Sequence, residues 1–323
     1  MIRAMPRISL PTPFSSSRST GSAAPAGPLG TLGSVVRHEA SGALRSRLPG
    51  RGRTRPDALP DPQAITPVRQ RVQADAERAA AFARCVGAAP GEHVHAGFLH
   101  TLTFPVSMRV LTAKAFPLPV LGLIHLENTA TVHHPVGTDD QLTVRSRIRE
   151  FGRHRRGITV TVLAEIWDES GRLVFSDESL YLSKTADRGA GEGSPSARTD
   201  RPDAREGARL IGRWRLPGDI GRRYAAVSGD ANPIHLSAVS AKAFGMKSSL
   251  AHGMYCASRA LGLLVSDPGA AGTWRVTFGS PVFLPATVDL WKVCDPEPDG
   301  QTAVRGIGRG ARQHFEVSFG RPS

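Results

Sequence analysis

The sequence predicts an α+β protein built from two similar halves, each with a long buried helix and an antiparallel β-sheet. Three observations support this fold class: runs in which apolar and polar residues alternate, an apolar helix-like segment in each half, and a break in composition near the middle of the chain. The chain has 323 residues, of which 40% are hydrophobic, so it can bury a sizeable core.

Two stretches of unusual composition divide the chain. Residues 186–207 are rich in Gly, Ser, Pro and mixed charges without apolar periodicity, which is typical of a linker. Residues 1–33 are rich in Ser, Pro, Gly and Arg and contain no acidic residue, so we expect a disordered leader there. A transit peptide and a start codon placed too far upstream are alternatives for this segment. The expected folded halves are residues 34–185 and 208–323.

Both halves are expected to contain similar elements in the same order. Each begins with a short helix, at about 75–86 and at about 218–228. The second half continues with another short helix, about 236–245, and with a long helix, about 253–267, that is apolar nearly all round. The alternating runs predict strands at about 121–134, 140–151, 157–168, 172–184, 273–279, 283–294, 301–309 and 313–319.

An internal repeat supports this division. At an offset of 146 residues, "FPVSMRVLTA" (104–113) aligns with "LAHGMYCASR" (250–259), and the strands beyond them follow the same offset. At an offset of 142, "FARCVGAAPGEH" (82–93) aligns with "YAAVSGDANPIH" (224–235). We therefore expect a duplicated unit.

The net charge of +13 does not indicate a nucleic-acid-binding protein. The first 72 residues carry a surplus of eight positive charges, and the rest of the chain shows no basic stripe with interleaved aromatic residues. We expect no nucleic-acid partner, while a weak attraction for a phosphate-bearing carrier stays compatible with this charge. No apolar run reaches the roughly 18 residues that a membrane-spanning helix needs.

The cysteines favour a reducing compartment. Cys85, Cys256 and Cys294 lie far apart and follow no metal-binding spacing, so we expect no disulfide framework and a cytoplasmic location. Cys256 lies in an apolar run and is interpreted as a buried, inert thiol.

The stretch "YAAVSGDANPIHLSA" (224–238) carries the best candidate for chemistry. Gly229 permits a sharp turn, and Pro233 stiffens the chain, so the side chains of Asp230 and His235 would be held at fixed positions. A carboxylate and an imidazole held together can bind one water molecule and act as an acid–base pair.

Three other interpretations of this loop compete. It resembles an ordinary helix cap and turn, in which the Asp caps and the Pro punctuates. A metal site would need a third ligand, and none stands at a recognisable spacing, so we expect no metal. A nucleophile triad lacks its nucleophile, because the chain contains no G-x-S-x-G and no cysteine lies nearby.

A second feature lies at the start of the apolar segment. His252 and Gly253 open the expected long helix, whose free N–H groups can hold a developing oxyanion. Gly253 allows a carbonyl to approach the backbone closely, whereas His252 is interpreted as a structural contact. An acid–base pair beside an oxyanion donor is suited to reactions at the α and β carbons of a thioester.

The stretch "YAAVSGDANPIHLSAVSAKAFGMKSSLAHGM" resembles the hydratase-2 signature of the MaoC-like family, Y-A-x-x-S-G-D-x-N-P-I-H followed by A-H-G-M. The likeness extends over about 30 positions and continues in "VTFGSPVFLPATV" (276–288). It implies a double hot-dog fold in which the long helix of each half is wrapped by its sheet. It also implies hydration of trans-2-enoyl thioesters, or dehydration of (R)-3-hydroxyacyl thioesters, without a metal or redox cofactor.

The resemblance assigns a role to several residues of the second half. Asp230 and His235 would activate the water and shuttle the α-proton, and the Gly253 amide would polarise the thioester carbonyl. Asn232 would help to orient the loop and the water, and Tyr224 and Ser228 would be supporting residues.

The first half is expected to be inactive. Ala88 stands where the second half has Asp230, and "AAPGEH" departs from "DANPIH" almost throughout, so His93 is interpreted as a relic. This half is expected to help shape the acyl-chain tunnel. The expected partner is an acyl-CoA or acyl-carrier-protein thioester; a monomer and a homodimer are both compatible with the sequence. A hot-dog thioesterase and a non-catalytic thioester-binding subunit are the alternative functions.

Overall fold

The computed structural model describes residues 59, 61–184, 203–294 and 302–320. The leader expected at residues 1–33 and most of the linker expected at 186–207 lie outside these ranges. The described part of the chain is an α+β protein with one continuous ten-stranded sheet, in the order β1-β3-β4-β5-β2-β7-β10-β9-β8-β6. All neighbouring strands are antiparallel.

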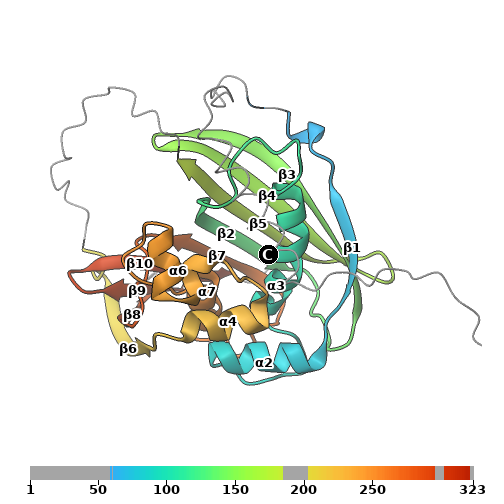
Figure 1. Ribbon diagram of the computed structural model, residues 1–323. Helices are drawn as coiled ribbons and strands as arrows, with labels where there is room; N and C mark the ends of the chain where they lie inside the picture. The colour runs from blue at the N-terminus through green and yellow to red at the C-terminus, as the bar shows by residue number, and fades with distance from the viewer. Residues whose placement is uncertain (1–58, 60, 185–202, 295–301, 321–323) are drawn as a thin grey trace, which may run out of the picture.

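Each half contributes five strands and its own helices, as in a double hot-dog (Figure 1). The elements of the first half are η2 (Pro62–Ala64, a 3-10 turn), β1 (Val68–Gln73), α2 (Ala76–Val86), α3 (Ala96–Leu111), β2 (Ile124–Val132), β3 (Gln141–His154), β4 (Gly157–Asp168) and β5 (Leu173–Lys184). Those of the second half are β6 (Ala208–Leu216), α4 (Ile220–Ser228), α5 (Pro233–Leu236), α6 (Ala238–Ala243), α7 (Gly253–Leu261), β7 (Gly272–Phe278), β8 (Ala286–Cys294), β9 (Thr302–Gly308) and β10 (Arg312–Gly320).

The two central helices lie on the same side of the sheet. Helix α3 packs against β3 and β4, while α7 packs against β7 and β10, and α2 runs beside α4 (Figure 1). Thirteen of the sixteen residues of α3 are buried, which explains why its sequence is apolar nearly all round. One hydrophobic cluster crosses both halves and includes Phe82 and Phe98 of the first and Trp274 of the second.

The expected strands after the long helices are confirmed, but two strands were missed. Both β1 and β6 lie at the outer edges of the sheet, where they pair with β3 and β8. Strand β6 contains only two buried residues, Trp214 and Leu216, whereas β1 alternates but its inward positions, which include Gln70, are only half-buried. A strand that packs against the core along only part of its length gives little period-2 signal.

Two expected helices are also shorter than predicted. The helix expected at 253–267 ends at Leu261, because Gly262 is a poor helix former and the chain then turns toward Pro268. The helix expected at 236–245 is two short helices, α5 and α6, which are separated at Ser237 in an extended conformation. Cys256 on α7 is 1% exposed, and burial raises the pKa of its thiol to about 12, as expected of an inert cysteine.

The structure corrects how the halves correspond before the central helices. Gly87 and Gly229 both end a helix in the left-handed conformation, as the offset of 142 predicts. His95 and His252, however, both precede a central helix, which is an offset of 157. The alignment of residues 104–113 with the start of α7 is therefore wrong.

The same correction removes the pairing of His93 with His235. His93 forms a β-bridge with Gly137, as Leu250 does with Phe283, so His93 is the counterpart of Leu250. His95 stands eight positions after the helix-ending Gly87, whereas His252 stands 23 positions after Gly229. The first half consequently has no equivalent of the segment that carries Asp230 and His235.

A buried polar network lies between α3 and the sheet of the first half. The Asp177 carboxylate, 3% exposed, lies 2.7 Å from His100 Nδ1 and accepts hydrogen bonds from Thr103 Oγ1 at 2.9 Å and Asn128 Nδ2 at 2.5 Å. Burial acts to raise the pKa of Asp177, but His100 and the hydrogen bonds outweigh it, so the pKa is lowered. The carboxylate is therefore charged and fully partnered.

Replacing Asp177 with Ala is expected to reduce the free energy of unfolding by about 3–5 kcal/mol, because buried donors lose their acceptor. Urea denaturation at pH 7 measures this, with Glu169→Ala in the exposed hairpin turn as a control expected to stay within about 0.5 kcal/mol. Since folding lowers the Asp177 pKa, the stabilisation is complete above its ordinary pKa of 3.8 and disappears as pH falls through the folded-state value. An Asp177→Ala protein as stable as the wild type at pH 7 would contradict this.

Candidate active site

The turn after α4 holds the Asp230 carboxylate by local hydrogen bonds. Gly229 has φ 80°, and the Asp230 N–H then donates to Ser228 Oγ at 3.2 Å. Asp230 Oδ1 accepts from the Asn232 N–H at 3.1 Å, which closes an Asx-turn. Asn232 Oδ1 in turn accepts from the Ile234 N–H at 3.3 Å and begins α5. Asn232 thus orients the loop.

His235 is held in one tautomer by the backbone. Its Nδ1 lies 2.9 Å from the carbonyl oxygen of Leu250, so Nδ1–H is the donor and Nε2 keeps a free lone pair. Burial lowers the pKa of His235, with the charge of Asp230 acting in the opposite direction. A neutral imidazole with a free Nε2 is suited to accept a proton.

His252 contacts both Asp230 and His235. Its Nε2 donates to the Asp230 carbonyl oxygen at 3.0 Å and lies 3.7 Å from Asp230 Oδ2. Its ring stacks on His235, with the centroids 3.8 Å apart, and Tyr224 packs at 4.9 Å on it. Burial, aided by His235, lowers the pKa of His252 to about 3, so the ring is neutral. The sequence analysis interpreted His252 as a structural contact, and in the structure its ring contacts Asp230 and His235.

The two remaining supporting residues lie behind the turn. Tyr224 is 2% exposed and Ser228 is 3% exposed, and both belong to the buried face of α4. Tyr224 packs against His252 and against Phe82 of the first half, at 4.9 and 5.9 Å between ring centroids. Burial raises the pKa of its hydroxyl well above the ordinary value, so it stays protonated.

Gly253 is the first residue of α7, and only glycine fits there. A Cβ at this position would lie 2.7 Å from Cε1 of Phe278. The described residues supply no acceptor for the Gly253 N–H, which points from the positive end of the helix dipole. His252, which contacts both Asp230 and His235, directly precedes Gly253, so the start of α7 lies next to the Asp230 turn.

The first half adds two residues that sequence reasoning missed. His125 from β2 stacks on Tyr181 from β5 at 4.5 Å and packs at 4.9 Å from Phe278. Burial lowers the pKa of His125 to about 3, burial also raises the pKa of Tyr181, and the charge of Asp230 acts on both groups. Both are half-buried, and the influence of the Asp230 charge on their pKa values indicates that they lie near the Asp230 turn. No local motif around residues 125 and 181 marked them.

The site contains three groups of the kinds that bind metals. Ligand atoms of Asp230, His235 and His252 all lie within 4.8 Å of one another. His252 Nε2, however, uses its proton on the Asp230 carbonyl, and the Nδ1 of the same ring is buried without a hydrogen-bond partner among the described residues. Besides this buried Nδ1, the Asp230 carboxylate and His235 Nε2 remain. Catalytic zinc sites use about three protein ligands. The available atoms are better suited to hold a water molecule between an acid and a base.

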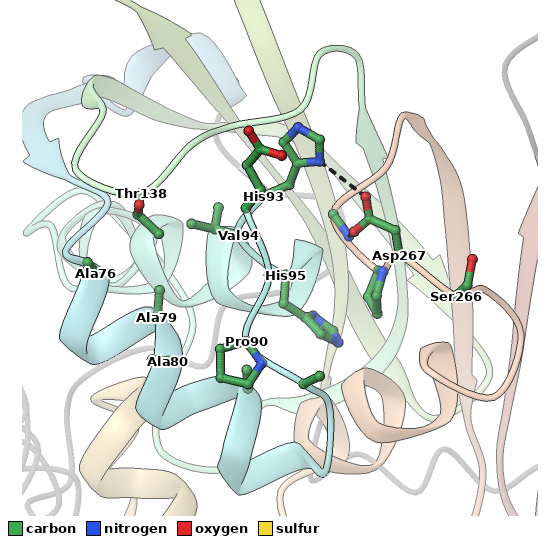
Figure 2. A pocket seen from close by; sticks show the side chains of 16 residues that line it. Ala76, Ala79, Ala80, Pro90, His93, Val94, His95, Thr138, Ser266 and Asp267 are labelled. Carbon is green, nitrogen blue, oxygen red and sulfur yellow. Dashed lines mark hydrogen bonds and ion pairs between the residues drawn. The ribbon is translucent and has the colours of Figure 1, made fainter.

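A separate pocket of about 340 Å³ lies between α2 and the loops 89–95 and 266–269 (Figure 2). His93 stands at its rim, and His93 Nδ1 lies 3.1 Å from Asp267 Oδ2 (Figure 2). Neither Asp230 nor His235 lines this pocket. His93 thus binds the loop that follows α7 and lies outside the candidate active site.

Models of known protein families match both halves of the chain. A MaoC-like domain model matches residues 209–306, and a model of a FAS1-like dehydratase domain region matches residues 72–177. The 3-hydroxyacyl-thioester dehydratase X of Mycobacterium tuberculosis is 31% identical over 236 residues, which are 73% of this chain and 82% of that protein. The chain belongs to the MaoC-like dehydratase family. MaoC-like dehydratases are hydro-lyases.

Solved structures agree with the fold. The crystal structure of HtdX from Mycobacterium tuberculosis has a TM-score of 0.65 at 27% identity and covers 80% of this chain and 100% of its own. A second protein of that organism, described as having a double hotdog fold, has a TM-score of 0.50 at 16% identity and covers 77% and 92%. The second likeness concerns the fold alone. Among the described residues of this MaoC-like chain, no helix is long and apolar enough to cross a membrane.

The contact between Gly253 and Phe278 allows a test of the helix start. Gly253→Ala is expected to lower kcat by about 10², because the added methyl group displaces Phe278 or the free N–H that holds the oxyanion. The double variant Gly253→Ala with Phe278→Leu relieves the clash and is expected to recover part of the loss. Steady-state dehydratase kinetics measure both variants, with Phe278→Leu alone as the control. Full activity of Gly253→Ala would show that this N–H is not used.

Proposed function

We propose that this protein catalyses the reversible hydration of trans-2-enoyl thioesters to (R)-3-hydroxyacyl thioesters in fatty-acid metabolism. One observation carries the proposal: a carboxylate and a neutral imidazole share a stiff turn beside the unpaired N–H of Gly253. The relative that is 31% identical is named a 3-hydroxyacyl-thioester dehydratase, which supports the same substrate class. The thioester is carried by CoA or by a carrier protein.

The catalytic cycle needs one water and no change of oxidation state. Water lies between Asp230 and His235, and His235 Nε2 accepts one proton as the water oxygen adds to C3 of the enoyl group. Asp230 accepts a hydrogen bond from the same water and stabilises the imidazolium. The Gly253 N–H donates to the carbonyl oxygen, which gains negative charge as the enolate forms. The proton is then delivered to C2, so both residues return to their first state.

Dehydration is the same path in reverse. His235 removes the proton from C2, the Gly253 N–H stabilises the enolate, and the hydroxyl group leaves C3 as water after taking up a proton. Only one imidazole and one carboxylate are required, because the proton removed from C2 is the proton that completes the water. His252 keeps the two groups in place by its bond to the Asp230 carbonyl and its stacking on His235.

Two alternatives use the same fold with another outcome. A thioesterase would direct the water to C1 and release the free thiol, and a binding subunit would hold the thioester without turnover. The paired Asp230 and His235 favour hydration over binding alone. We expect the enzyme to act in the cytoplasm, since Cys85 and Cys256 are free thiols.

The proposal is tested with purified protein and crotonyl-CoA, by following the loss of enoyl-thioester absorbance. Asp230→Asn and His235→Ala are each expected to lower kcat/KM by about 10² or more, because each removes one member of the acid–base pair. His93→Ala is the matched control and is expected to keep wild-type activity. Release of free CoA by the wild type would favour the thioesterase, and unchanged activity in both site variants would refute the mechanism.

The pH dependence follows from the lowered pKa of His235. Hydration needs the neutral ring, so kcat/KM is expected to stay level as pH falls through 6.5, the ordinary histidine pKa, and to decline only below it. The measurement is kcat/KM for crotonyl-CoA between pH 5 and 8 at constant ionic strength. A decline centred at or above pH 6.5 would contradict a desolvated neutral base.

A further inference from the structure

We propose that Arg78, on α2 of the first half, is a positioning residue that holds the catalytic turn of the second half. The inference rests on the proposed function and adds a role for the half that lacks the Asp230 segment. Arg78 touches neither Asp230 nor His235; it acts on the backbone that leads into them.

The guanidinium group binds the carboxyl end of α4. Arg78 Nε donates to the Val227 carbonyl oxygen at 3.0 Å, and Nη2 donates to the Ser228 carbonyl oxygen at 3.3 Å. The last carbonyls of a helix have no donor within the helix, and a cation placed there also interacts favourably with the helix dipole. Arg78 therefore supplies the donors that α4 itself lacks at the peptides before Gly229.

The other side of the guanidinium group is fixed by α3. Nη2 also donates to Thr101 Oγ1 at 3.3 Å, and the guanidinium carbon lies 5.4 Å from the centre of the Phe98 ring. Thr101 Oγ1 is itself fixed, since it donates to the Phe98 carbonyl oxygen at 2.7 Å. At the base of the side chain, the Arg78 N–H donates to Asp75, which caps α2. Two helices of the first half thus hold the cation in one place.

Ser228 links this cation to the reacting groups. Its carbonyl oxygen accepts from Arg78, while its Oγ accepts from the Asp230 N–H. The next residue, Gly229, turns in the left-handed conformation, so a rotation of the Ser228–Gly229 peptide changes the direction in which Asp230 leaves the helix. A displacement of about 1 Å at a reacting group can cost about 10² in rate. Loss of Arg78 is therefore expected to reduce kcat without removing any group that touches the substrate.

The side chain is costly to place where it is. Burial lowers the pKa of Arg78, and the negative charge of Asp75 offsets this only in part. Its acceptors at the turn are neutral carbonyls, which give direction but no full opposite charge. Directional, partly desolvated hydrogen bonds of this kind are suited to hold the backbone of the turn in one conformation.

The decisive variants are Arg78→Met and Arg78→Lys, with Arg84→Met as the matched control. Arg84 lies in the last turn of the same helix and is exposed. For hydration of crotonyl-CoA, Arg78→Met is expected to lower kcat by about 10–10² with KM changed less than about threefold. Arg78→Lys is expected to fall between, because an ammonium group cannot bind two carbonyls in the fixed geometry of a guanidinium. Arg84→Met is expected to match the wild type.

Two readouts separate positioning from a merely structural role. Ethylguanidinium at millimolar concentration is expected to restore part of kcat in Arg78→Ala, whose truncated side chain leaves room for the cation, and to leave Arg84→Ala unchanged. The NMR signals of the His235 ring are expected to shift or broaden in Arg78→Met. The spectra are recorded at a temperature at which the thermal unfolding curve shows that the variant is fully folded. The Arg78→Lys variant serves the same purpose if Arg78→Met does not fold.

The outcomes are distinct from those for the proposed function. A wild type without hydratase activity would refute the proposed function, and the His235 spectra would still decide whether Arg78 positions the turn. Wild-type kcat and unchanged His235 signals in Arg78→Met would overturn the positioning role. So would a loss of kcat that merely follows the folded fraction and does not respond to ethylguanidinium.

Discussion

The antiparallel pairing of β2 with β7 is the interaction on which the rest of the molecule depends. It joins two five-stranded sheets into one, in a register that places Glu127 opposite Thr277 and Asn128 opposite Val276. Because of that register, His125 at the start of β2 lies beside Phe278 at the end of β7. The first half thereby brings His125 and Tyr181 near the Asp230 turn, and a single hydrophobic core continues from one half into the other.

The candidate site combines rigid backbone with neutral rings. The tautomer of His235 is set by the Leu250 carbonyl, and His252 is bound to the Asp230 carbonyl, so the loop is closed at both ends by imidazoles. Burial keeps these rings uncharged, which preserves a proton acceptor next to a carboxylate. In such a partly desolvated place, hydrogen bonds to a developing charge are stronger than in water. The backbone contacts already hold Asp230 and His235 in place, so little rearrangement of these side chains is needed when a substrate binds.

Much of the fold was readable because its signals are local. The alternating strands, the αL glycines and the stiff "SGDANPIH" turn each express a periodicity or a backbone preference of their own residues. The edge strands β1 and β6 were not, since each depends on partners far away in the chain. The break at Ser237, which caps α6, and the early end of α7 at Gly262 have local causes that the sequence analysis missed. The contribution of His125 was equally hidden, because nothing near residue 125 records that Phe278 will lie next to it. Low-identity repeats also allow competing offsets, and the starts of α3 and α7 together with the bridges at His93 and Leu250 decided between them.

The difference in spacing between Gly87–His95 and Gly229–His252 has a consequence for how this protein can be re-engineered. The first half does not differ from the second by one lost carboxylate, so an aspartate introduced at position 88 would have no counterpart of the segment that carries His235 and of the turn that holds Asp230. A second centre would require a transplanted segment that carries α5 and α6 with it. The two halves thus differ in the length of the segment before the central helix, and no single substitution can remove that difference.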